Sequence, residues 1–269
     1  MPTLRCADLQ LYYEDTGTGP VVVWIPGTGL RASSWQAQVD AFSDRYRSLS
    51  LDLRGSGETR ADDSSLPFTV ADLAVDVARW LDGLGVTEAI VVGLSLGSAV
   101  AQELALARPD LVRGLVLVAT WSSSRREHHI RRHFESRLYA LEHGPLDVYR
   151  QFGFWMSSPT LYDTEPDRQA EVERLLAGAM STDLAGTAAH FRADLGHETR
   201  DRLGSLTCPT LVVHGDEDLI TLPRYNHTVA GLVPGAALAT IPASGHLAPF
   251  ERPAELNALI EEFLARSAP

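Results

Sequence analysis

The chain has 269 residues, of which 45% are hydrophobic and 22% are charged, and its formal net charge is −12. This is the composition of an ordinary globular protein that is long enough to bury a sizeable core. The acidic balance provides no basic stripe to neutralise phosphates, which argues against a nucleic-acid partner. The two cysteines, Cys6 and Cys208, lie far apart and predict no disulfide framework.

The N-terminal residues predict neither export nor membrane insertion. They lack the apolar core of a signal peptide and go directly into the alternating pattern LQLYYED, which is typical of an antiparallel hairpin. No apolar run reaches the roughly 20 residues that a membrane span needs. We therefore expect a cytoplasmic protein with no membrane partner.

Short continuous apolar runs predict strands of a parallel sheet that is buried on both faces. In chain order they cover 21–25, 49–51, 90–92, 115–118, 211–213 and 238–241. Helical patterns lie between them: an apolar stripe over 70–84 with Thr69 as N-cap, a helix over 96–108, and a C-terminal helix around 256–264. Strands that alternate with helices predict an α/β fold with a doubly wound sheet.

One stretch interrupts this alternation. Residues 121–195 show helical patterns without a convincing strand and hold nine of the chain's twenty aromatic residues. We predict an α/β core formed by 1–120 and 196–269, with 121–195 inserted as a helical lid. Because an aromatic-rich cap favours an apolar or ring-bearing ligand, we expect four residues to contact the substrate. They are Leu94, Trp121, Phe154 and Trp155.

The sequence GLSLG at 93–97 matches the Gly-x-Ser-x-Gly pattern of a nucleophile elbow. It follows a predicted strand and opens a predicted helix, which is the context that this motif requires. The sharp turn forces strained backbone geometry on the middle residue, and its neighbours must be small. We therefore predict that Ser95 presents its hydroxyl at the top of the sheet as a nucleophile.

A serine hydroxyl needs a base, and the base needs a carboxylate that orients it. His246 follows the last predicted strand and is the candidate base. The preceding strand is followed by three acids, from which we choose Asp218 and keep Asp216 as the alternative. The chain order serine, acid, histidine is the one expected on this scaffold.

The oxyanion hole is predicted from two backbone amides. One belongs to Leu96, the residue after the nucleophile, and the other to Thr28 in the glycine-rich loop that follows an early strand. The Thr28 hydroxyl either donates a third hydrogen bond to the oxyanion or forms a hydrogen bond within its own loop, and the sequence leaves both possibilities open.

The remaining histidines predict no metal site. His128, His129 and His133 lie close together, but no Cys or carboxylate ligand set accompanies them, so a solvated basic face explains them better. We expect neither a metal nor an organic cofactor.

Together, six segments resemble the α/β-hydrolase superfamily over nearly the whole chain. They are PGTG, DLRGSG, GLSLG, ARPDLVRGLVLVAT, HGDEDLITLP and SGHLAPFERPAELNALIEEFL. The chain is most similar to the subgroup of 3-oxoadipate enol-lactonases, cofactor-free bromoperoxidases with perhydrolase activity, and esterases. The resemblance implies a mostly parallel eight-stranded sheet with helices on both faces and a helical lid.

The chain departs from the family pattern at three positions. Pro26 stands where the family usually has a histidine before the glycine, Leu94 replaces a common polar residue, and Ser98 replaces a second glycine. The apolar neighbours of Ser95 favour a less polar substrate than a diacid lactone. Haloalkane dehalogenases and epoxide hydrolases of this superfamily use an aspartate nucleophile, so Ser95 argues against both.

The resulting hypothesis is a serine-dependent hydrolase of a small carboxylic ester or lactone that works through an acyl-enzyme. The alternatives are a carbon–carbon bond hydrolase, a perhydrolase or a tailoring cyclase with the same three residues, and a non-catalytic small-molecule receptor. Arg125, Arg126 and Arg192 in the predicted lid are either clamps for a substrate carboxylate or surface charges. The sequence leaves the oligomeric state open, a homodimer included.

Overall fold

The computed structural model describes residues 2–63 and 67–267. Within these residues nine strands form one sheet with the order β1-β2-β4-β3-β6-β7-β8-β9, and the short β5 pairs with β2. The strands are β1 (Thr3–Cys6), β2 (Leu9–Thr16), β3 (Val21–Ile25), β4 (Arg47–Leu51), β5 (Arg60–Ala61), β6 (Ala89–Leu94), β7 (Val112–Val118), β8 (Thr210–Gly215) and β9 (Ala237–Ile241).

The predicted fold class is confirmed. From β4 to β9 every pairing is parallel, and β1 and β2 add the predicted antiparallel hairpin at one end. The two-residue β5 is the one strand added to the eight that the resemblance implied. The strand at 238–241 was expected to be buried, but β9 lies at the sheet edge and its Leu238 is 40% exposed.

Eleven α-helices lie in the described ranges. They are α1 (Gln36–Phe42), α2 (Val70–Gly83), α3 (Leu96–Ala107), α4 (His128–His143), α5 (Leu146–Gln151), α6 (Pro159–Thr164), α7 (Pro166–Ala179), α8 (Leu184–Gly196), α9 (Pro223–Leu232), α10 (Ala248–Glu251) and α11 (Pro253–Ser267). The predicted cap of α2 is confirmed, because the Thr69 hydroxyl accepts the Asp72 N–H and the Asp72 carboxylate accepts the Thr69 N–H.

The core is divided by the sheet into two apolar clusters, because successive side chains of a strand point to opposite faces. Val23 and Ile25 of β3 pack with α2, α3 and α9, whereas Val22 and Trp24 pack with α1 and α11. The same alternation runs through β7. Both faces are thus covered by helices, which explains the continuous apolar runs in the strand sequences.

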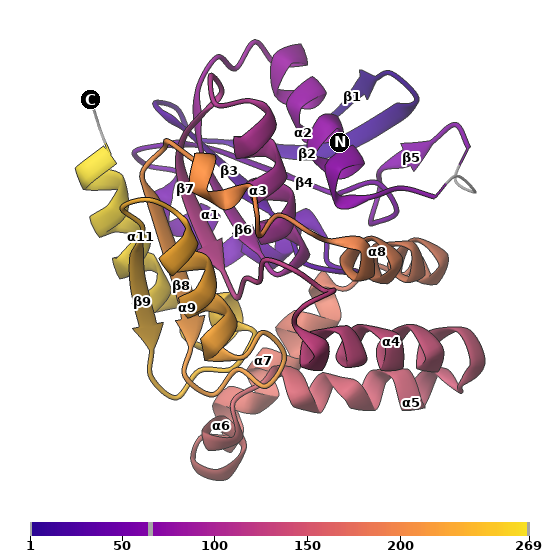
Figure 1. Cartoon of the computed structure of the whole chain (residues 1–269). Helices are drawn as coiled ribbons and strands as arrows, with labels where there is room; N and C mark the ends of the chain where they lie inside the picture. The colour runs from indigo at the N-terminus through magenta and orange to yellow at the C-terminus, as the bar shows by residue number, and fades with distance from the viewer. Residues whose placement is uncertain (1, 64–66, 268–269) are drawn as a thin grey trace.

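Residues 121–195, here called the helical segment, contain α4 to α8 and no strand among those described. Figure 1 shows α4, α5, α6 and α7 gathered beyond the ends of the strands, with α8 beside α4. Across the described ranges, none of the helices combines the length and apolar character that crossing a bilayer requires.

The contact between β3 and the start of α3 provides a test of the packing. A Cβ at Gly97 would lie 2.2 Å from the carbonyl oxygen of Ile25, and neither backbone can move easily. We expect Gly97→Ala to lower the free energy of unfolding by about 2 kcal/mol or more in urea denaturation.

Gly178→Ala in α7 is the matched control, since a Cβ there meets nothing within 4 Å. It should leave stability unchanged or raise it by about 0.5–1 kcal/mol. Equal effects of the two substitutions would contradict the packing argument.

Candidate active site

Ser95 occupies a strained turn between β6 and α3. Its φ of 52° and ψ of −119° place this non-glycine residue in a sparsely populated backbone region. Gly93 is required below it, because a Cβ there would lie 2.2 Å from the Gly97 carbonyl oxygen. The Ser95 N–H donates to Val118 O of β7 at 2.9 Å, so the neighbouring strand also holds the turn in place. This is the geometry that the GLSLG motif predicts.

The register of the parallel strands brings the glycine-rich loop beside the elbow. Ile25, the last residue of β3, pairs with Gly93, so both chains leave the sheet at the same level. An ideal Cβ on Gly27 would lie 3.5 Å from Ser95 Cβ, and Thr28 lines the same cavity as Ser95. Leu96 opens α3 on the other side of the serine.

The Thr28 hydroxyl donates to Asp194 Oδ2 at 2.7 Å, near the C-terminal end of the helical segment. Of the two alternatives left open by the sequence, the structure therefore shows the hydroxyl bonded to another side chain rather than presented to the cavity.

Asp218 and His246 meet in the same way, because Gly215 of β8 pairs with Ile241 of β9 and their following loops start side by side. His246 Nδ1 lies 2.9 Å from Asp218 Oδ2, and both side chains are buried. The alternative acid, Asp216, is exposed. The structure thus pairs His246 with the acid chosen from the sequence.

The Asp218 carboxylate is held in its charged form. Burial alone would raise its pKa, but His246 and the surrounding hydrogen-bond donors together outweigh burial. Further donors are the Thr221 hydroxyl at 2.6 Å and the N–H groups of Ile220 and Thr221 at 2.7 and 3.0 Å. The pKa of Asp218 therefore lies below its usual range, and the group stays an acceptor that fixes the imidazole tautomer.

Glu251 organises the loop that carries His246. Its buried carboxyl group accepts the N–H groups of Gly245 at 2.8 Å, Leu247 at 3.0 Å and Ser158 at 3.1 Å. The His246 N–H in turn donates to Met156 O at 2.8 Å. Sequence reasoning missed this role of Glu251, although the motif FERP that contains it was noted.

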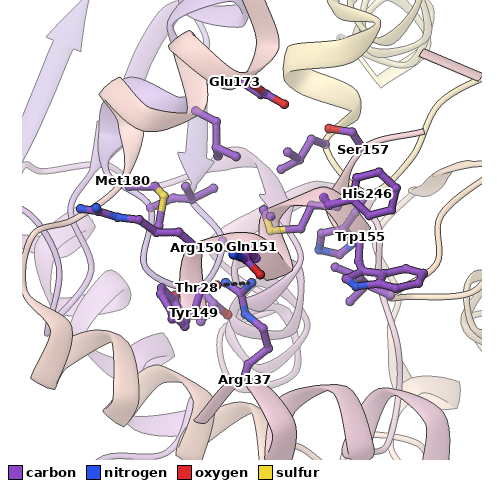
Figure 2. Close-up of a pocket in the computed structure, with 18 of the residues that line it drawn as sticks. Thr28, Arg137, Tyr149, Arg150, Gln151, Trp155, Ser157, Glu173, Met180 and His246 are labelled. Carbon is purple, nitrogen blue, oxygen red and sulfur yellow. Dashed lines mark hydrogen bonds between the residues drawn. The ribbon is translucent and has the colours of Figure 1, made fainter. Parts of the chain in front are cut away.

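A cavity of about 980 Å³ lies above the elbow. Ser95 and His246 line it from the sheet, and the helical segment supplies most of its other walls (Figure 2). The described contacts include no hydrogen bond between Ser95 Oγ and His246. Hydrogen bonds between catalytic groups are often long in the absence of substrate and shorten when it binds, so the missing bond does not argue against this pair.

The residues predicted to contact the substrate divide into two groups. Leu94, Phe154 and Trp155 line the cavity, and both aromatic side chains are about half exposed. Trp121 is a correction: it is completely buried, packs on Phe134, and donates from its indole nitrogen to Ser124 Oγ at 2.9 Å. Its position at the end of β7 makes it a core residue rather than part of the cavity wall.

The arginines singled out from the sequence lie on the surface. Arg125 and Arg126 are exposed, and Arg126 pairs with Asp201 at 2.7 Å, while Arg192 pairs with Glu142. Two arginines line the cavity, Arg150 of α5 and Arg137 of α4, and the guanidinium of Arg137 lies 4.3 Å from the centroid of the Tyr149 ring. Sequence reasoning missed Arg137 because nothing in α4 marks one arginine as buried.

His133 was predicted to belong to a solvated basic face and lines the cavity instead. Burial, together with the charges of Arg137 and His246, lowers its pKa to about 3, so it is neutral at physiological pH. Among the described residues no group of three or more His, Cys, Asp or Glu side chains is arranged to hold a metal ion.

Comparisons with known proteins agree with this geometry. The model of a family described as the alpha/beta hydrolase family matches residues 22–259. A Mycobacterium tuberculosis protein provisionally named non-heme bromoperoxidase BpoC is 30% identical, over 96% of this chain and 98% of its own. A protein from Azorhizobium caulinodans, provisionally named carbamate hydrolase RutD, is 30% identical over 91% of both chains.

Among solved structures, a thermophilic esterase from Thermogutta terrifontis superposes with a TM-score of 0.84 at 27% identity, covering 97% of this chain and 95% of its own. The family match extends from β3 to the C-terminal helix and therefore includes the elbow, both loops and the helical segment. The chain belongs to the alpha/beta hydrolase family.

Proposed function

We propose that the protein is a serine-dependent hydrolase of a carboxylic ester or lactone whose substrate is small and largely apolar or ring-containing. The observation that carries this proposal is the shared cavity, in which strained Ser95 and the His246–Asp218 pair face walls that include Leu94, Phe154 and Trp155. The names of the relatives, an esterase and a carbamate hydrolase among them, fit attack on a carbonyl carbon.

The proposed reaction begins when His246 takes the Ser95 proton and Ser95 Oγ attacks the carbonyl carbon. The N–H groups of Thr28 and Leu96 stabilise the oxyanion of the tetrahedral intermediate. His246 then protonates the leaving alkoxide, and water repeats the sequence on the acyl-enzyme. Asp218 stabilises the imidazolium at both stages because its carboxylate remains ionised.

Arg137 supports a finer proposal about the substrate. Its side chain is 5% exposed, lines the cavity, and is held by the Tyr149 ring and by the Tyr149 carbonyl oxygen at 3.5 Å. Aromatic contact occupies the face of a guanidinium, while its N–H groups point outward in the plane. We propose that this edge binds a polar oxygen of the substrate, a carboxylate included.

The first prediction concerns the nucleophile. Ser95→Ala should lower kcat for 4-nitrophenyl esters by at least about 10⁴-fold, because no other group replaces the attacking oxygen. A fluorophosphonate should label Ser95 in the wild type, as mapped by mass spectrometry. Ser136→Ala, at an exposed position of α4, is the control.

Turnover that persists in Ser95→Ala would refute the nucleophile assignment. A wild type that retains a small molecule tightly but hydrolyses no ester or lactone would favour the receptor, and cleavage of carbon–carbon bonds or peracid formation would favour the alternative chemistries.

A second prediction separates the two candidate acids. Asp218→Asn should reduce kcat by about 10⁴-fold, because the amide cannot hold the imidazole in the required tautomer. Asp216→Asn should leave kcat within about twofold. Steady-state kinetics of the two purified variants on one ester provides the comparison, and the reverse order of effects would transfer the role to Asp216.

A third prediction tests Arg137 with two esters of matched length, 4-nitrophenyl pentanoate and mono-4-nitrophenyl glutarate. Arg137→Gln should reduce kcat/KM for the glutarate about 10-fold more than for the pentanoate, because a hydrogen bond to a charged group is worth about 1.5–3 kcal/mol. Arg132→Gln on the exposed side of α4 is the control. An equal loss for both esters would show that Arg137 serves only the packing of the segment.

A further inference from the structure

The loop that carries Thr28 is held by the helical segment at three successive polar groups. The Thr28 hydroxyl donates to Asp194 Oδ2 at 2.7 Å, and the Gly29 N–H donates to His190 Nδ1 at 3.1 Å. The Gly29 carbonyl oxygen accepts the N–H of Ser181 at 2.8 Å. All three partners come from the chain between the end of α7 and the end of α8.

Helix α8 lies directly against this loop. Gly29 has a φ of +67°, and a Cβ on it would lie 2.9 Å from a Thr187 methyl carbon, so only glycine fits between loop and helix. The Thr28 side chain and the Gly29 N–H are both bound to α8, and the Gly27 carbonyl oxygen accepts the Leu30 N–H at 3.0 Å, so the peptide units on either side of Thr28 are both held. Their orientation decides where the Thr28 N–H points.

We propose that Asp194 and His190 are positioning residues that aim the Thr28 N–H at the developing oxyanion, and that Asp194 does so as a neutral carboxylic acid. This inference rests on the hydrolase function proposed above and adds a dependence of that function on α8. Neither residue touches the reacting atoms.

The neutral state of Asp194 follows from its surroundings. The residue is fully buried, and in the described part of the chain the Thr28 hydroxyl is the single hydrogen-bond donor to its carboxyl group. Asp218, buried to the same degree, has three donors besides His246. A single neutral donor would compensate an ionised carboxylate for only a small part of the hydration free energy that it loses on burial. In agreement with this, burial raises the pKa of Asp194 to about 8.

Among the residues that the structure describes, no ionised partner of Asp194 offsets that burial: desolvation raises its pKa, and the Thr28 hydroxyl alone lowers it. The titratable or charged groups on the elements around it include His190 of α8, His197 after α8, Arg137 of α4, the Arg192–Glu142 pair between α8 and α4, the helix cap Asp183, and the Arg54–Asp76 pair beside α2. Burial lowers the pKa of His190 to about 4 and that of His197 to about 3, so both are neutral near pH 7. Arg137 lies 5.7 Å from the centroid of the Phe191 ring.

The tautomer of His190 is fixed by the same network. Its Nε2 donates to Arg54 O at 2.7 Å, so Nδ1 carries the lone pair that accepts the Gly29 N–H. Protonation of Nδ1 would remove that acceptor. The neutral imidazole is therefore the form that holds the loop, and the lowered pKa of His190 maintains this form at physiological pH.

The consequence is an alkaline limit to activity. As the pH rises through about 8, Asp194 loses its proton and places a negative charge beside the loop whose amide must stabilise a developing negative charge. We expect the wild-type kcat to fall at least about fivefold between pH 7 and pH 9.5. Asp194→Asn keeps a carbonyl oxygen for the Thr28 hydroxyl and has no proton to lose, so its kcat should be level over the same range.

The experiment compares pH profiles of kcat and KM for one 4-nitrophenyl ester in the wild type, Asp194→Asn and Asp183→Asn. Asp183 caps the start of the same helix and accepts the Gly186 N–H at 2.8 Å, so its variant should keep the alkaline fall. His190→Gln, which offers an acceptor without the imidazole geometry, should lower kcat about 10-fold or more with little change in KM.

The outcomes are distinct. An alkaline fall that persists in Asp194→Asn, in an enzyme that depends on Ser95, overturns this inference alone. A wild type that turns over no ester overturns the proposed function and this inference with it. Should Asp194→Asn not fold, thermal denaturation of the wild type decides: a neutral buried Asp194 predicts a Tm that falls between pH 7 and pH 9, and a level Tm overturns the inference.

Discussion

Backbone crowding at the strand-to-helix turn is the constraint on which the other features of this molecule depend. A Cβ at Gly97 would meet the end of β3, and a Cβ at Gly93 would meet α3, so β3, β6 and α3 approach as closely as main chains can. That approach is possible only with a residue of positive φ between the glycines, which is Ser95. The strain thus determines which side chain leaves the sheet and which loop lies beside it.

The helical segment lines the cavity and also holds the loops that carry His246 and Thr28. Through Ser158 and Met156 it binds the loop that carries His246, and through Asp194 and His190 it binds the loop that carries Thr28. The loops that carry Thr28 and His246 therefore depend on contacts made by residues inserted between β7 and β8. For the proposed hydrolase, a change in the segment is expected to alter the positions of Thr28 and His246 as well as the shape of the cavity, and so to affect both substrate preference and rate.

Sequence patterns predicted the features that depend on local order along the chain. The strands, the cap of α2, the elbow and the Asp218–His246 pair follow from periodicity and from residues at the ends of strands, where parallel register aligns the loops. Burial inside the helical segment was not predictable in this way. Trp121 looked like a cavity residue and belongs to the core, while His133 looked like a surface residue and lines the cavity, and no sequence pattern marked Arg137 as a cavity residue. Their environment is set by how α4 packs on α8, which one sequence does not reveal.

Three buried carboxyl groups show how the same fold assigns different charge states to one functional group. Asp218 has four hydrogen-bond partners including His246, and its pKa is lowered. Glu251 has three backbone N–H donors and no paired cation among its described contacts, and burial raises its pKa. Asp194 has one hydroxyl donor, and its pKa is raised to about 8.

Burial is comparable in all three cases, so the number and charge of the hydrogen-bond partners decide whether the pKa of each carboxyl group is lowered or raised. In the proposed reaction, Asp218 beside the imidazole remains ionised and stabilises a positive charge, while Asp194 behind the Thr28 loop remains neutral where a second negative charge would oppose the developing oxyanion.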